Sequence, residues 1–251
     1  MNYLEKYKHL TSILRDMESV LVAFSGGVDS TFLLTVAHQV LGNNAIAAIA
    51  HSVLIPKSEL NFAREFACTR DIPLKTISFE PLNQPVIQLN EPERCYHCKK
   101  LLFNQLISLK ETRGIKWIAE GSNNDDQKLY RPGNASAREL GIRQPLAEAG
   151  LTKNEIRILS RNLNLPTWNK PSMACLATRF PYGEALTSEK LIQVEKAEEF
   201  IRKIVTGEFR VRHHGTIARI EVTRTDTDLI LNHLDPIVSM LKSLGFSLYM
   251  S

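Results

Sequence analysis

The amino-acid sequence predicts an α/β protein with a doubly wound parallel sheet and a smaller, mixed α+β domain after it. Short apolar runs alternate with helical periodicity from Val20 to Glu120, which is typical of parallel strands joined by crossover helices. A glycine-rich turn separates the first of these strands from its helix. A proline-bounded break at 166–171 then changes the pattern, so we expect domains at 1–170 and 171–251.

The first domain is expected to begin with an amphipathic helix over 4–17. Strands are predicted at 20–24, 45–50, 74–79 and 115–120, with helices at 32–41, 58–69 and 99–110. The polar segment 123–134 is expected to be a functional loop that closes over substrate. Thr152 and Glu155 form a capping box, which predicts that a further helix begins there.

The second domain is expected to be small. The sequence predicts a helix at 188–205, a hairpin of strands at 209–212 and 218–222, a helix at 226–244 and a last strand at 246–250.

Composition limits the possible classes of protein. The chain has 251 residues, of which 43% are hydrophobic, enough for a sizeable core. Its net charge of +4 permits anionic substrates without requiring nucleic acid. Neither a signal peptide nor an apolar run of membrane-spanning length is visible, so a cytoplasmic protein without membrane contact is expected. The four cysteines are then better explained as thiols or metal ligands than as a disulfide framework.

The glycine-rich turn has the sequence Ser25-Gly26-Gly27-Val28-Asp29-Ser30. Gly26 and Gly27 allow close approach of an anion, so that backbone N–H groups and the helix dipole can hold phosphate. No Gly-Lys-Ser/Thr follows, which excludes a Walker loop. The alternative is a turn between strand and helix that binds nothing.

The SGGxDS pattern resembles the pyrophosphate loop of the PP-loop ATP pyrophosphatases, a superfamily with the adenine nucleotide alpha hydrolase-like fold. Members cleave ATP between its α- and β-phosphates and adenylate a substrate oxygen. The resemblance implies ATP as cofactor, bound by Ser25, Gly26, Gly27, Asp29 and Ser30. The charge on pyrophosphate calls for Mg²⁺, with Asp29 as a ligand. Gly121 is either a contact to adenine or a plain turn glycine.

Four segments extend this resemblance over nearly the whole chain: SGGVDS, GSNNDD, KPSMACLATRFPYG and FRVRHHGTIARIEV. Together they are similar to the ATP-dependent sacrificial sulfur transferases of the LarE type, which serve nickel-pincer cofactor biosynthesis and lactate racemase maturation. The resemblance implies a nucleotide substrate, pyridinium-3,5-biscarboxylic acid mononucleotide, one carboxylate of which is adenylated and converted to a thiocarboxylate. Cys175 matches the family nucleophile, which in single-cysteine members gives up its sulfur and becomes dehydroalanine. Homo-oligomerisation is implied by the resemblance alone.

Several charged residues are candidates for this chemistry. Lys170 and Arg179 lie near Cys175 in sequence, where positive charge favours a thiolate. Arg210 and Arg212, two residues apart on one strand face, are expected to clamp the phosphate or carboxylate of the substrate, the alternative being a solvated face. Glu199 and Glu221 are either ligands of a divalent metal or surface charges.

The pair Cys95 and Cys98 departs from the single-cysteine pattern. With Cys175 as a distant third ligand, these residues can hold a [4Fe-4S] cluster whose open iron binds sulfide. Zinc with His97 as fourth ligand is one alternative, and two uninvolved thiols at a helix end are the other. The Cys95–Cys98 and Cys175 segments are both expected to be loops. Cys68 is expected to be buried in an apolar helix and inert.

Three other functions remain open on the sequence: tRNA 2-thiolation, amide formation by a ligase of the same superfamily, and sensing of intact ATP. No accessory RNA module, zinc-knuckle pair or strong basic run is present, so nucleic acid is not the expected partner.

Overall fold

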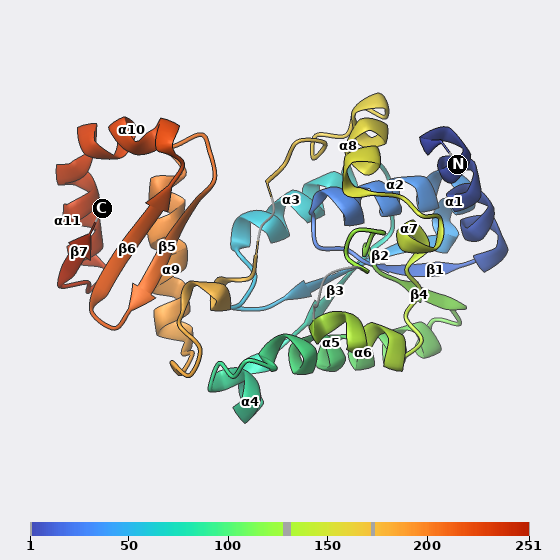
Figure 1. Cartoon of the computed structure of the whole chain (residues 1–251). Coiled ribbons are helices and arrows are strands. Elements are labelled where there is room, and N and C mark those ends of the chain that lie inside the picture. Colours follow the sequence, from blue (N-terminus) through green and yellow to red (C-terminus); the bar gives the residue numbers. More distant parts are fainter. Residues whose placement is uncertain (1, 128–131, 172–173, 251) are drawn as a thin grey trace. The chain divides into compact units, whose positions relative to one another are not determined.

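The structure, a computed structural model, describes residues 2–127, 132–171 and 174–250 (Figure 1). The chain divides into two compact units. Unit 1 comprises Met1–Ser52, Lys57–Phe79 and Cys95–Met173, and unit 2 comprises Val53–Pro56, Glu80–Arg94 and Ala174–Ser251. The contiguous boundary between residues 170 and 171 stays a prediction.

Unit 1 is built on a sheet of four parallel strands in the order β3-β2-β1-β4. These strands are β1 (Val20–Ala23), β2 (Ala45–His51), β3 (Leu74–Ser78) and β4 (Trp117–Ala119). Val20 pairs with Ala45 on one side and with Trp117 on the other. The predicted α/β class with a parallel sheet is confirmed. Strands β2 and β3 lie on one side of β1, and β4 lies on the other, so the strand order reverses between β1 and β4. Ligands of such sheets bind beside this reversal, at the carboxyl ends of the strands.

Helices cover both faces of this sheet (Figure 1). One face carries α1 (Tyr3–Met17), α2 (Val28–Leu41), α3 (Lys57–Cys68) and α8 (Lys153–Asn162), and the other carries α5 (Arg94–Thr112) and α6 (Pro132–Glu139). The short helix α7 (Pro145–Glu148) precedes α8. The expected capping box of α8, between Thr152 and Glu155, is present.

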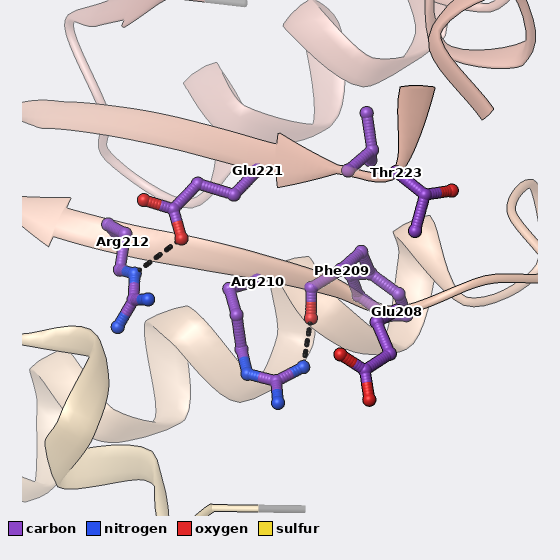
Figure 2. Close-up of a pocket in the computed structure, with 7 residues that line it drawn as sticks. Glu208, Phe209, Arg210, Arg212, Glu221 and Thr223 are labelled. Atoms are coloured by element: carbon purple, nitrogen blue, oxygen red, sulfur yellow. Dashed lines mark hydrogen bonds and ion pairs between the residues drawn. The ribbon is translucent and has the colours of Figure 1, made fainter. Parts of the chain in front are cut away.

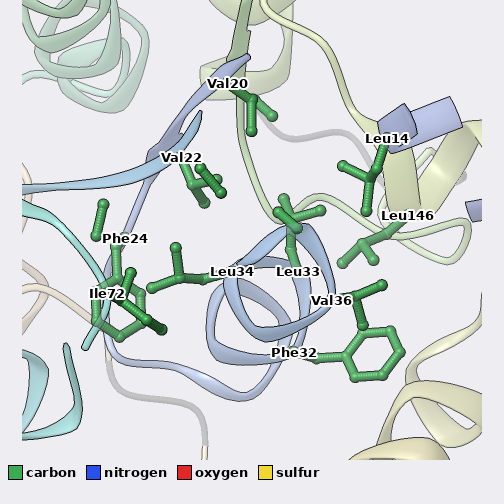
Figure 3. Close-up of a cluster of buried hydrophobic side chains, with 14 of the residues drawn as sticks. Leu14, Val20, Val22, Phe24, Phe32, Leu33, Leu34, Val36, Ile72 and Leu146 are labelled. Atoms are coloured by element: carbon green, nitrogen blue, oxygen red, sulfur yellow. The ribbon is translucent and has the colours of Figure 1, made fainter. Parts of the chain in front are cut away.

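The alternation of side chains along β1 explains how one strand serves two cores. Val20 and Val22 pack on the side of α2, in a cluster that includes Phe32 and Leu33 (Figure 3). Leu21 points to the opposite face and belongs to the cluster around Phe103 of α5. Each such buried side chain contributes about 1.5–3 kcal/mol, so β1 and the loop after it rest on a rigid base.

Unit 2 contains a small mixed sheet in the order β5-β6-β7. β5 (Phe209–His214) and β6 (Ile217–Val222) form the expected antiparallel hairpin, and β7 (Leu248–Met250) pairs in parallel with β6. The helices of unit 2 are α4 (Pro85–Gln88), α9 (Ser188–Ile201), α10 (Thr227–Asn232) and α11 (Leu234–Ser243). The side chains of α9, β5, β6 and α11 share one apolar core, which includes Ile201, Val211 and Ile237.

The single helix expected at 226–244 is wrong, because the chain forms α10 and α11 there. Pro236 lacks the N–H that would bond to the carbonyl of Asn232, and its ring would clash with that carbonyl in a continuous helix. The segment 123–134 is also only partly a loop, because α6 begins at Pro132. Residues 128–131 of that segment lie outside the described residues, as do Ser172 and Met173 of the Cys175 motif.

Two expectations about cysteines are wrong. α5 begins at Arg94, so Cys95 and Cys98 lie in the first turns of a helix instead of a loop. Cys68 ends α3 and is exposed. The buried face of α3 is formed by Leu60, Ala63 and Phe66, and Cys68 does not share it. In the ranges that the structure describes, no helix is long and apolar enough to cross a lipid bilayer.

Candidate active site

The glycine-rich loop joins the end of β1 to the start of α2. Gly26 has a φ of +73°, in the left-handed region that favours glycine. Gly27 is the N-cap of α2, and among the described residues no side chain caps this helix start. The first N–H groups of a helix need acceptors, and an uncapped start after a glycine turn suits an anion.

Two serines brace this loop from within. The hydroxyls of Ser25 and Ser30 lie 3.0 Å apart. The Ser30 hydroxyl also donates to the Gly27 carbonyl at 3.3 Å and accepts from the Ser25 N–H at 3.3 Å. Because Ser30 is buried, these bonds brace the turn from the protein interior.

Asp29, the expected Mg²⁺ ligand, is already paired with a cation in unit 1. The Nζ atom of Lys153, at the start of α8, lies 2.5 Å from Oδ2 of Asp29. The amide of Asn123 donates to the other carboxylate oxygen at 3.4 Å. A metal ion at Asp29 would therefore compete with Lys153, and the assignment of Mg²⁺ to Asp29 stays a prediction.

Gly121 follows β4 and packs against the first turn of α2. A Cβ atom at this position would lie only 2.9 Å from the backbone nitrogen of Ser30. This close approach requires glycine whether or not a ligand is bound. The contact between Gly121 and adenine stays a prediction.

Cys175 directly precedes a 3-10 helix (Leu176–Arg179) in unit 2. Arg179 is fully buried, and its guanidinium donates to the carbonyls of Ala174 at 2.9 Å and Cys175 at 3.3 Å. The same guanidinium forms two bonds to Glu198 of α9, at 2.8 and 3.0 Å. Arg179 thus braces the main chain on which the cysteine is carried. Its expected effect on the Cys175 thiol stays a prediction.

A second pair of polar side chains braces the segment that follows Cys175. Asn90 donates to the carbonyl of Pro181 at 2.7 Å, and Arg94 donates to the carbonyl of Ala177 at 3.3 Å. Arg94 also bonds to the side-chain oxygen of Asn90. Both side chains are buried, so the backbone around the cysteine is held on two sides within unit 2.

Arg210 and Arg212 line a pocket of about 320 Å³ between the ends of β5 and β6 (Figure 2). Arg212 bonds to Glu221 at 2.8 Å and to the carbonyl of Thr178 at 2.7 Å. The Arg210 guanidinium donates to the carbonyl of Phe209 at 2.6 Å. Burial, helped by the charge of Arg179, lowers the pKa of Arg210, yet an arginine stays protonated. Glu208 and Glu221 also line the pocket, so the formal charges of its two arginines and two carboxylates balance. The role of Arg210 and Arg212 as a clamp for phosphate or carboxylate stays a prediction.

The two expected metal carboxylates lie in different surroundings. Glu199 is exposed on α9, next to the buried Glu198. Glu221 pairs with Arg212 and Arg219; burial raises its pKa, but the bonds from the two arginines outweigh this and lower it. Among the residues that the structure describes, no group of three or more His, Cys, Asp or Glu side chains could hold a metal ion. A metal at Glu199 and Glu221 stays a prediction.

Cys95 and Cys98 are half-buried in the first turns of α5. Their spacing of three residues puts both thiols on one face of the helix, as a shared ligand requires. A [4Fe-4S] cluster needs Cys175 as well, which belongs to the other unit. The cluster therefore stays a prediction, with zinc or two uninvolved thiols as its alternatives.

Sequence reasoning missed several side chains that hold the site together, and the strongest signal was at Glu198. That residue shares the face of α9 on which Leu191, Val194 and Ile201 are buried, and an acid at such a position needs a buried partner. Lys170 was noticed only as a neighbour of Cys175 in sequence, but it pairs with Glu59 of α3 in unit 1. Nothing local in the sequence marks Asn90, Arg94 or Lys153.

The parallel sheet and the uncapped glycine-rich loop define the class, a doubly wound α/β protein of the PP-loop type. No family model matches the chain. It is 35% identical over 238 residues to pyridinium-3,5-bisthiocarboxylic acid mononucleotide synthase of Lactiplantibacillus plantarum, covering 94% of this chain and 86% of that protein. The chain therefore belongs to the family of this synthase, as its four sequence segments indicated.

Two further relatives are similar to the chain over most of its length. An uncharacterized protein of Synechocystis sp. is 40% identical over 217 residues, covering 86% of this chain and 81% of the relative. One of the subunits of a glutamine-hydrolysing GMP synthase of Saccharolobus islandicus is 26% identical over 211 residues, covering 74% of this chain and 55% of that relative.

Proposed function

We propose that this chain is an ATP-dependent sulfur transferase that acts on pyridinium-3,5-biscarboxylic acid mononucleotide. It adenylates one carboxylate of this substrate and converts it to a thiocarboxylate through Cys175. The observation that carries the proposal is the 35% identity, over 94% of the chain, to a synthase named for the bisthiocarboxylic product. The uncapped start of α2 behind Gly26 and Gly27 supports a phosphate-binding role for the loop.

Adenylation gives the reaction its driving force. The substrate carboxylate attacks the α-phosphate of ATP, and pyrophosphate leaves. The N–H groups at the start of α2 bind the phosphates, while Lys153 supplies a positive charge beside Asp29. Bound Mg²⁺ would neutralise the charge that develops on pyrophosphate. The carboxylate oxygen thereby acquires AMP as its leaving group.

The sulfur step follows on the activated carbonyl carbon. The Cys175 thiolate attacks it, AMP leaves, and a thioester joins substrate and protein. Loss of the Cα proton with cleavage of the Cβ–S bond then gives the thiocarboxylate and leaves dehydroalanine at position 175. Arg179 keeps the carbonyls of Ala174 and Cys175 in place, and Arg210 and Arg212 bind the phosphate of the mononucleotide.

The source of sulfur divides the proposal into two routes. In the sacrificial route Cys175 is consumed after one turnover. In the other, Cys95, Cys98 and Cys175 would hold a [4Fe-4S] cluster, which would supply an open iron for sulfide, so that Cys175 would not be consumed. A homo-oligomer in the cytoplasm is part of the same proposal and rests on the family alone.

The direct test mixes the protein with ATP, Mg²⁺ and the biscarboxylate mononucleotide, and follows pyrophosphate release and the mass of the protein. The sacrificial route predicts one product per chain and a mass loss of about 34 Da, one H₂S, at Cys175. Cys175→Ala should release pyrophosphate without forming thiocarboxylate, and Cys68→Ala, at an exposed cysteine, should behave as the unchanged protein.

Other outcomes of this test separate the rival functions. Absence of pyrophosphate release would leave an ATP sensor. Full turnover by Cys175→Ala with an amine as acceptor would indicate an amide-forming ligase. Thiolation of tRNA in place of the mononucleotide would overturn the assigned substrate.

A further inference from the structure

Lys170 lies against the glycine-rich loop in a set of contacts within unit 1. Its Nζ atom donates to the Gly26 carbonyl at 3.1 Å and to Oε2 of Glu59 at 2.7 Å. The same ammonium lies 4.3 Å from the ring centroid of Phe62. The side chains of Lys170 and Glu59 are only 20% and 10% exposed, so this pair is far less screened than a surface pair.

Helix α3 provides the other side of this arrangement. Glu59 and Phe62 are three residues apart and therefore point from the same face of α3. A Cβ atom on Gly26 would lie 3.1 Å from Cδ1 of Phe62 and 3.4 Å from Oε2 of Glu59. The loop is thus seated directly on α3, and Gly26 is needed both for its φ and for its lack of a side chain.

The bond to Lys170 has a consequence for the opposite side of the same peptide. The peptide unit is planar and, as no peptide bond in the described ranges is cis, the Gly26 C=O and the Gly27 N–H point in opposite directions. An ammonium that holds the carbonyl toward α3 therefore turns the Gly27 N–H away from α3. A donor so oriented is available to an anion at the start of α2.

We infer that Lys170 is a positioning residue, which fixes the Gly26–Gly27 peptide so that the Gly27 N–H faces the pyrophosphate part of ATP. This inference rests on the proposed function of the loop. Glu59 takes part in this positioning, because its carboxylate holds the Lys170 ammonium against the Gly26 carbonyl. Lys170 acts through the backbone and does not touch the phosphates.

A direct contact between Lys170 and phosphate is the competing explanation, and Glu59 separates the two. If Lys170 bound phosphate, Glu59→Gln would release the ammonium from its carboxylate and leave ATP binding unchanged or tighter. If Lys170 positions the peptide, Glu59→Gln weakens the anchor, and ATP binding becomes weaker. The two explanations thus predict different ATP affinities for the same Glu59→Gln variant.

The test measures the dissociation constants of Mg·ATP and of AMP by calorimetry, because AMP lacks the pyrophosphate part. Lys170→Met should raise the constant for ATP about tenfold, in line with a charge-assisted hydrogen bond, and change that for AMP less than about twofold. Lys170→Arg should restore most of the ATP affinity. Glu59→Gln should weaken ATP binding several-fold.

Lys6→Met is the matched control. Lys6 pairs with Glu155 at 2.8 Å, and the two side chains are 18% and 20% exposed, but Lys6 makes no contact with the loop among the described residues. Lys6→Met should lower the free energy of unfolding, as Lys170→Met does. It should leave the dissociation constants of Mg·ATP and AMP unchanged.

Unchanged ATP binding in Lys170→Met would overturn the inference, as would equal weakening of ATP and AMP binding. Unchanged or tighter ATP binding in Glu59→Gln would overturn it as well. Failure of the unsubstituted protein to bind ATP would instead overturn the proposed function of the loop, and the inference with it.

Discussion

Arg179 and Glu198 form a two-bond ion pair, with Nε to Oε1 at 2.8 Å and the second nitrogen to Oε2 at 3.0 Å. Their side chains are 0% and 4% exposed. The Glu198 carboxylate also accepts from the N–H of Val211 in β5. One buried pair therefore links the segment of Cys175, helix α9 and the hairpin of unit 2.

Removal of one partner of this ion pair should strongly destabilise the folded chain. Arg179→Met leaves the Glu198 carboxylate buried without its charge partner, and we expect a loss of about 3–5 kcal/mol in the free energy of unfolding. The double variant with Glu198→Leu should be less destabilised than Arg179→Met alone. Urea unfolding measures both. Lys100→Met, which breaks an exposed pair with Glu139, should leave the midpoint almost unchanged. Additive effects of the two buried substitutions would show that the pair is not coupled.

The buried His213 should make stability depend on pH. Burial lowers the pKa of His213 below its ordinary 6.5, and the charge of Lys190 lowers it further, although Glu184 at 3.1 Å opposes this. The unfolded chain therefore binds a proton at a higher pH than the folded chain does. The contribution of neutral His213 to the free energy of unfolding is complete above about pH 6.5. It is lost as the pH falls through the lowered pKa of His213 in the folded state.

His213→Gln should therefore flatten the curve of unfolding free energy between about pH 7 and about pH 5, as measured by urea unfolding at each pH. His233→Gln, at an exposed histidine, is the matched control. An equal slope in His213→Gln and the unsubstituted chain would contradict the prediction.

Local patterns were sufficient for most of the fold. The continuous apolar run of β1, the capping box of α8 and the glycine turn each involve neighbours in sequence, and all were predicted. The start of α5 was missed because its first turn, Arg94 to Cys98, is polar and carries no apolar period. The split between α10 and α11 was readable from Pro236, but the apolar pattern on both sides concealed it.

The contacts that shape the candidate site are of another kind. Lys153 and Asp29 are 124 residues apart, and Lys170 and Gly26 are 144 apart. No periodicity in the sequence joins such pairs, because they are set by the packing of α3 and α8 on the sheet. The sequence therefore indicated which residues form the glycine-rich loop but not which lysine side chains contact it.

The arginines of the pocket should distinguish the mononucleotide from ATP. Arg210→Gln is expected to raise the KM for the mononucleotide about 10- to 100-fold, the range of a lost charge-assisted bond, and to leave the KM for ATP unchanged. Arg219→Gln is the control, since Arg219 pairs with Glu221 at 2.5 Å but does not line the pocket. Initial rates of pyrophosphate release at varied concentrations of each substrate give both constants. An equal rise in the KM values for the mononucleotide and for ATP would contradict a role of Arg210 in binding the mononucleotide alone.

The thiols of α5 provide the decisive test of the sulfur source. If Cys95 and Cys98 hold a [4Fe-4S] cluster, protein purified without oxygen and reconstituted with iron and sulfide should contain about four of each per chain and absorb in the brown iron–sulfur band. Cys95→Ser should lose the iron, the sulfide and the absorbance, whereas Cys68→Ser, at an exposed thiol elsewhere in unit 1, should retain all three. About one zinc per chain, lost in both Cys95→Ser and His97→Ala, would indicate a zinc site instead. If neither metal binds, repeated turnover has no cluster to depend on, and the mass loss at Cys175 must equal the amount of thiocarboxylate formed.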